Sequence, residues 1–129
     1  LLLCFYLFFI IGKTLLIRTP WQDPLSNIMG GWIIYQVPNG YINAESIENF
    51  LFFIPFFILL YLGYPRIVHK KSLIKILLCS LFIGLMISLS IEVLQVIFQR
   101  GTFQYADLFY NSSGSVLGGY IYYLIKSFK

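Results

Sequence analysis

The stretch LIKILLCSLFIGLMISLSIEVLQVIF, residues 73–98, decides the fold of this chain. It exceeds the roughly 20 apolar residues that a helix needs to cross a bilayer, and its only charged residues are Lys75 and Glu92. Three further apolar stretches surround it, and the whole chain is 59% hydrophobic and 11% charged, more apolar surface than a soluble domain of this size could bury. The sequence therefore predicts an all-α integral membrane protein with four transmembrane helices at about residues 1–17, 47–62, 73–98 and 108–125.

The other three apolar stretches differ in how well they fit a membrane span. Residues 1–17 and 47–62 are short for a membrane span, and Pro55 interrupts the second of them. We expect one domain over residues 1–129, with the N-terminus incomplete because the chain opens on Leu1 inside an apolar run. A long polar connection between the first two helices carries Trp21, Trp32 and Tyr35. We expect its residues 25–37 to lie along the membrane surface, anchored by aromatic side chains.

The positive charges predict the orientation of the helices. Six of the nine Lys and Arg residues fall in or beside the connection between the second and third helices or at the C-terminus, namely Arg66, Lys70, Lys71, Lys75, Lys126 and Lys129. Because cytoplasmic loops are enriched in Lys and Arg, we expect both termini on the cytoplasmic side (N-in/C-in) and the long connection outside. This distribution also accounts for the net charge of +4 without a nucleic-acid partner.

Small and polar residues recur every fourth position along residues 73–98, as Ser80, Gly84, Ser88 and Glu92. This spacing lines one helix face, and small residues on one face let a second helix approach closely. The fourth helix offers similar ridges, so we predict close contact between Gly84 and Gly118. Glu92 would then face into the bundle, since a carboxylate in a membrane helix usually faces a partner or a water-filled cavity.

The same reasoning gathers a candidate ligand-binding site at the outer end of the bundle. Glu92 lies about 28 Å along an ideal helix from Leu73, level with the outer ends of the second and fourth helices. The predicted site residues are Glu92, Gln95, Arg100, Asp107, Asn111 and Asn49. Structural roles stay open beside this one, because Asp107 could cap the fourth helix, Asn111 could form an interhelical hydrogen bond and Arg100 could contact headgroups.

At these residues the chain resembles the VanZ-like family, named for a teicoplanin-resistance protein of Gram-positive bacteria. The resemblance rests on three pieces over about residues 49–122: Asn49 before FLFFIPF, IEVLQ at 91–95, and RGTFQYADLFYNSSGSVLGG at 100–119. Three positions depart from the family pattern: Phe57 stands where a Gly is common, Gln104 replaces an acid and Ala106 replaces another polar residue. The resemblance implies a multi-pass protein of the cell envelope and a link to teicoplanin resistance.

The leading functional hypothesis is binding of a lipid-linked cell-wall precursor or a lipoglycopeptide in an outer-leaflet polar pocket, with membrane lipid as a further partner. Trp21, Trp32 and Tyr35 could cover such a pocket. Two other functions stay open: an enzyme acting on a lipid-linked phosphate or glycan, with Glu92 or Asp107 as general base, and a small proton-coupled transporter. Catalytic residues are unassigned, and no cofactor or metal is expected because no ligand spacing is present.

Overall fold

A computed structural model describes residues 1–18, 20, 23, 25–32 and 44–128 of the chain. Within these residues the regular structure is entirely helical, which confirms the all-α prediction. The elements are α1 (Leu2–Ile11), a π-helical turn η1 (Gly12–Leu16), α2 (Ala44–Gly63), a 3-10 turn η2 (Pro65–Val68), α3 (Leu73–Ile97) and α4 (Tyr105–Ser127).

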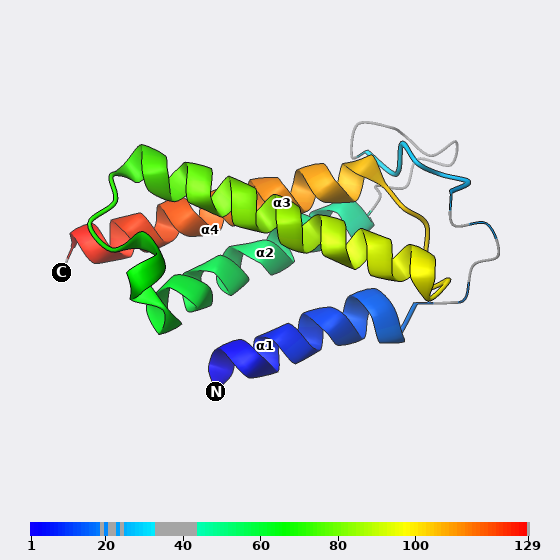
Figure 1. The fold of residues 1–129 in the computed structure, drawn as a ribbon, viewed down its shortest axis with the longest axis horizontal. Coiled ribbons are helices and arrows are strands. Elements are labelled where there is room, and N and C mark those ends of the chain that lie inside the picture. The colour runs from blue at the N-terminus through cyan, green and yellow to red at the C-terminus, as the bar shows by residue number, and fades with distance from the viewer. Residues whose placement is uncertain (19, 21–22, 24, 33–43, 129) are drawn as a thin grey trace.

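The helices form an up-and-down bundle in which α1 and α3 run one way and α2 and α4 the other (Figure 1). The basic connection around η2 and the end of α4 lie at one end of the bundle, which we call the basic end. The end of α3 and the starts of α2 and α4 lie at the opposite end, which we call the polar end (Figure 1). The four apolar stretches of the sequence thus become neighbouring helices with their polar connections at the two ends.

Helices α2 and α4 each begin three residues before the expected starts at 47 and 108. Their first turns hold Glu45 and Asp107 respectively, and acidic side chains are favourable at a helix N-terminus because the first N–H groups and the helix dipole are positive there. Apolar patterning does not detect such polar first turns, so it places the helix starts too late.

Two of the described helices, α2 and α3, are long and apolar enough to cross a membrane. Helix α1 has 10 residues and continues for 5 more as η1. Helix α4 has 23 residues, about 34 Å at 1.5 Å per residue, but small and polar residues dilute its apolar character. Most of these diluting residues are buried inside the bundle: Asp107, Asn111, Ser112, Gly114, Ser115, Gly118 and Gly119.

Helix α4 is the centre of the bundle, with its most extensive contacts to α2 and α3. Against α3 it forms a seam of small residues: a side-chain carbon on Gly84 would collide with Ser115, and one on Gly119 with Ser80. Farther toward the polar end, Asn111 Nδ2 donates to Ser88 Oγ over 2.8 Å. The predicted small-residue contact between the third and fourth helices is therefore present.

The prediction that Gly84 contacts Gly118 was wrong. Gly118 packs against α2, where an added side-chain carbon would collide with the Ile54 carbonyl oxygen and lie 2.9 Å from Phe57 Cβ. Gly114 meets the Phe50 carbonyl one turn away. Neighbouring helix positions point about 100° apart, so the Gly114 ridge and the Ser115 ridge face different helices. Two adjacent ridges on α4 thus admit two helices at close range.

Toward the basic end the core becomes aromatic and almost fully buried. Phe53, Phe57 and Tyr61 of α2 are buried and pack edge-on or stacked on one another. The hydroxyl of Tyr61 forms a hydrogen bond of 2.8 Å with Ser80 Oγ of α3, so the polar tip of this buried ring is paired. These contacts hold α2, α3 and α4 together at the basic end. The candidate site lies at the polar end.

Candidate functional site

Two buried carboxyl groups form the base of the site. Glu92 of α3 is 1% exposed and Asp107 of α4 is 2% exposed. Glu92 Oε2 accepts a hydrogen bond of 2.7 Å from the backbone N–H of Gln104, the residue that caps α4. Glu92 thus lies at the N-terminus of α4, where an anion is favourable. The sequence-based expectation that Glu92 faces the bundle interior agrees with this burial.

Arg18 is the cation nearest to the buried carboxyls. Its Nη2 lies 2.6 Å from Glu45 Oε1 and 3.7 Å from Asp107 Oδ2, and its side chain is 17% exposed. Gly101 makes room for it: a side-chain carbon there would lie 2.9 Å from Arg18 Nη1, and the φ of Gly101 is +129°. Only glycine adopts that conformation readily. The connection between α3 and α4 is therefore shaped around the guanidinium of Arg18.

Arg100, the cation predicted for this site, lies elsewhere. Its Nη1 donates to the backbone carbonyl of Arg18 over 3.3 Å. Among the described residues, the ion pair of Asp107 is with Arg18 and not with Arg100. Arg18 was not a predicted site residue, although the signal was available. It directly follows the first apolar stretch and so lies level with the starts of α2 and α4.

The three predicted amide residues are buried at this end. Asn49 lies within hydrogen-bonding reach of the Asp107 carboxyl. Gln95 Nε2 donates to the Thr14 carbonyl over 2.9 Å and so joins α3 to η1. Asn111 belongs to the seam with Ser88, one turn farther into the bundle than Asp107. The structure thus brings Glu92, Asp107 and Asn49 together, with Gln95 and Asn111 flanking them.

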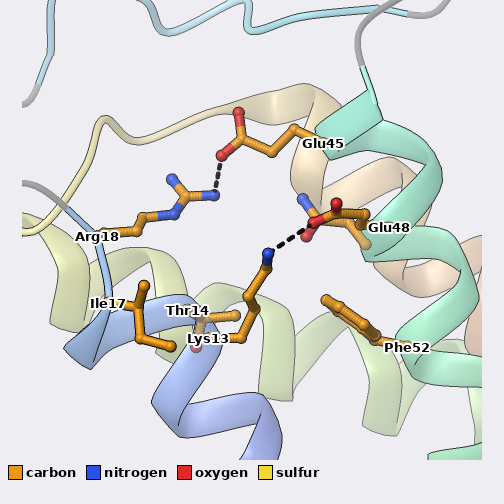
Figure 2. A pocket seen from close by; sticks show the side chains of 8 residues that line it. Lys13, Thr14, Ile17, Arg18, Glu45, Glu48 and Phe52 are labelled. Carbon is orange, nitrogen blue, oxygen red and sulfur yellow. Dashed lines mark ion pairs between the residues drawn. The ribbon is translucent and has the colours of Figure 1, made fainter.

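A cavity of about 160 Å³ lies between η1 and the start of α2, and two of its lining residues, Arg18 and Asn49, also lie beside Asp107. It is lined by Lys13, Thr14, Ile17, Arg18, Glu45, Glu48, Asn49 and Phe52, and we call it the polar cavity. Figure 2 shows Arg18 and Lys13 reaching across it to Glu45 and Glu48 on α2. Lys13 Nζ lies 3.3 Å from Glu48 Oε2, and both side chains are more than 40% exposed.

The polar cavity has the size and the charged groups that a polar ligand group would need. A cavity of about 150 Å³ can hold a molecule the size of benzene, so this one has room for one phosphate group or sugar ring. Its lysine and arginine supply charged donors, and its two glutamates supply charged acceptors. Within the described residues, no group of three His, Cys, Asp or Glu side chains is arranged to hold a metal ion.

The long connection contributes to this end of the bundle through its described residues 25–32. The Ile28 carbonyl accepts a hydrogen bond of 2.9 Å from the Tyr105 N–H at the start of α4. Trp32 packs on Phe109 and Tyr110 of α4, with ring centroids 5.5 and 5.9 Å apart. Trp32 is not among the residues that line the polar cavity. Trp21, Tyr35 and residues 33–37 lie outside the described residues.

Comparison with known proteins gives one assignment. No curated protein and no solved structure matches the chain. A model of the VanZ/LLP1 family matches residues 2–126, and these include α1, α2, α3, the polar cavity and all but the last residue of α4. Because this match spans nearly all of the 129 residues, the chain belongs to the VanZ/LLP1 family.

Proposed function

We propose that the protein is a multi-pass protein of the cell membrane, with four transmembrane helices and both termini on the cytoplasmic side. Family membership and the two long apolar helices support a membrane location. The outer surface of the bundle supports it further, because it presents exposed large apolar side chains along α1 and α3, such as Phe5, Phe8, Phe82 and Met86. Contiguous apolar surface of this kind is unfavourable in water.

The proposed orientation places the basic end in the cytoplasm and the polar cavity at the outer leaflet. Cysteine labelling tests this in a background where Cys4 and Cys79 are replaced by Ala. We expect an impermeant maleimide to label Met29→Cys in intact cells and to label His69→Cys only after permeabilisation, since both positions are exposed. Labelling of His69→Cys in intact cells, with Met29→Cys protected, would reverse the topology.

We propose that the polar cavity binds the polar part of a lipid-linked or glycopeptide-like ligand of the cell envelope. The observation that carries this is the cavity of about 160 Å³ whose walls hold both cations and carboxylates, and whose Arg18 also pairs with the buried Asp107. Ligand sites characteristically combine a concave shape with a few convergent polar groups. Phosphate, sugar and peptide groups need both donors and acceptors, and this cavity offers both.

The binding test uses the full chain in detergent, with a lipid-linked cell-wall precursor and teicoplanin as probes. Lys13→Gln removes one charged donor from the cavity mouth, and its ion pair is exposed enough for the fold to tolerate the change. We expect about tenfold weaker binding, the loss of one charge-assisted contact. Lys126→Gln at the basic end is the matched control and should bind as the wild type does. If neither probe binds the wild type, or Lys13→Gln binds equally well, the ligand assignment fails.

The cellular test asks whether the site supports reduced susceptibility to teicoplanin. Glu92→Gln keeps an oxygen that can accept the hydrogen bond from Gln104 while it removes the charge. At equal membrane levels, we expect the wild type to raise the teicoplanin concentration that the cells tolerate and Glu92→Gln to lose that effect. A variant that retains the full effect would assign Glu92 a structural role only.

A further inference from the structure

A second cavity lies against the same π-helical turn, and none of its described lining residues also lines the polar cavity. Its volume is about 320 Å³, and it is lined by Ile11, Leu15, Leu16, Phe98 and Arg100. Four of these five side chains are apolar, so we call it the apolar cavity. Lys13 and Thr14 of η1 line the polar cavity, whereas Leu15 and Leu16 line this one, so one turn of helix separates two cavities of opposite chemistry.

The arginine of the apolar cavity has donors to spare. All five acidic residues of the chain lie in the described residues, yet none of them forms an ion pair with Arg100, whereas Lys13 and Arg18 are both paired with carboxylates. The contact of Arg100 with the Arg18 carbonyl, at 3.3 Å, uses one of its five N–H groups. A guanidinium matches phosphate oxygens in a bidentate geometry.

The apolar side chains beside Arg100 face the surface where lipid would lie. Ile11, Leu16 and Phe98 are all exposed at the surface of the bundle. Arg100 follows the end of α3 by three residues, which places it at the depth where a membrane-spanning helix ends and headgroup phosphates begin. A cation at that depth beside an apolar hollow matches the two ends of one amphipathic molecule, a phosphate and an acyl chain.

We propose that the apolar cavity binds an acyl chain of an anionic membrane phospholipid whose phosphate group is held by Arg100. This site depends on the proposed membrane location but not on which ligand enters the polar cavity. Because Arg100 also holds the Arg18 carbonyl, a bound phospholipid fixes the end of η1 from which the Arg18 side chain enters the polar cavity. The bound phospholipid thereby stabilises the part of the fold that borders the polar cavity.

Lipid retention by the purified full chain tests the proposal. The probes are phosphatidylglycerol and phosphatidylcholine with identical acyl chains, and native mass spectrometry measures how much of each the protein retains in detergent. We expect the wild type to retain phosphatidylglycerol about tenfold better, the contribution of one charge-assisted contact. Arg100→Gln should reduce this preference to near equality, and Arg100→Lys should keep much of it.

Two further variants keep the outcome decisive. Leu15→Trp fills the cavity without touching the charge and should lower retention of both lipids severalfold. Lys126→Gln, at the basic end and outside both cavities, should retain phosphatidylglycerol as the wild type does, so the effect of Arg100→Gln is distinguishable from the loss of any surface cation. A failure of the polar-cavity proposal is seen separately, in the binding of the lipid-linked precursor and teicoplanin. If the wild type retains the two lipids equally, the bound lipid is ordinary surrounding lipid without a specific site. That result overturns the proposal. Wild-type phosphatidylglycerol retention by Arg100→Gln, or by Leu15→Trp if the arginine variant does not fold, overturns it as well.

Discussion

The two ends of the seam between α3 and α4 are built from similar residues but treat their polar atoms differently. Toward the basic end, Ser80 Oγ is paired with the Tyr61 hydroxyl and with the Ile76 carbonyl, each within 2.9 Å. Toward the polar end, the buried atoms Gln95 Oε1, Asn111 Oδ1 and Ser112 Oγ have no hydrogen-bond partner among the described residues.

The difference is between an end of the bundle whose buried polar atoms are paired and an end where some of them are not. A buried polar atom without a partner is unfavourable by about 1–3 kcal/mol, so the hydrogen bonding of the polar end stabilises the bundle less than that of the basic end. Gln95 and Asn111, which carry two of these unpaired acceptors, flank the buried Glu92 and Asp107 but are not among the described residues that line the polar cavity. The variants below begin with the largest expected effect and end with the smallest, and they are designed to break or sharpen this contrast.

Gly118→Leu should have the largest effect, because a side chain at this position would collide with the backbone of α2 at Ile54. The helices would have to move apart, and we expect stability to fall by about 3 kcal/mol or more. Folded yield and thermal unfolding in detergent measure the loss. Gly63→Leu is the matched control, since nothing lies within 4 Å of a side-chain carbon there. Equal yields from the two variants would contradict the close approach of α2 and α4.

Arg18→Gln should come next, since it removes the cation from a carboxyl that is almost fully buried. We expect the free energy of unfolding to fall by about 2–3 kcal/mol. This is below the range for fully buried ion pairs, because Arg18 is partly exposed and lies 3.7 Å from Asp107. Replacing Asp107 by Asn in the same chain should recover part of this loss, and thermal unfolding of the single and double variants gives the coupling.

Arg100→Gln is the comparison for that measurement. It loses one long hydrogen bond to a backbone carbonyl. We therefore expect the free energy of unfolding to fall by less than about 1 kcal/mol. If Arg100→Gln destabilises the protein more than Arg18→Gln does, Arg100 and not Arg18 is the cation that compensates the buried carboxyls.

The seam and the burial of Glu92 could be predicted from the sequence because both follow from helix geometry alone. A four-residue repeat defines a face wherever the helix is regular, and a carboxylate near the end of an apolar helix is expected to face a partner. The burial of Asp107 and Asn111 followed from the same argument. These residues lie on two long helices joined by a short connection, so little depends on the path of the rest of the chain.

The cation of the site and the partner of Gly118 could not be predicted in this way. Arg100 follows Glu92 closely in sequence, whereas Arg18 reaches Asp107 from a distant helix, and only the packing of η1 against α3 brings it there. The space that Gly101 leaves for Arg18 is also a property of the folded connection. Likewise, helical phase shows that Gly118 lies on a small-residue ridge but does not indicate which of two neighbouring helices it meets.

Ser80→Ala tests the paired end of the seam. The substitution removes the hydrogen-bond partner of the buried Tyr61 hydroxyl, and hydrogen bonds between membrane helices contribute about 0.6 kcal/mol on average and up to about 1.7. We expect a loss of about 1 kcal/mol in the free energy of unfolding. Tyr61→Phe should remove most of the effect of a subsequent Ser80→Ala, because the two hydroxyls act as one pair. Additive losses would mean that the pair is not formed.

Ser112→Ala tests the unpaired end and should have the smallest effect. Its hydroxyl is buried without a partner among the described residues, so removing it deletes an unfavourable group and costs no hydrogen bond. We expect stability in detergent to be unchanged or to rise by less than about 1 kcal/mol, in contrast to Ser80→Ala on the same seam. The comparison is fair because both serines are buried where α3 and α4 meet and both lose a single oxygen. If Ser112→Ala costs as much as Ser80→Ala, the polar end is satisfied internally, and the contrast between a paired end and an unpaired end of the seam does not hold.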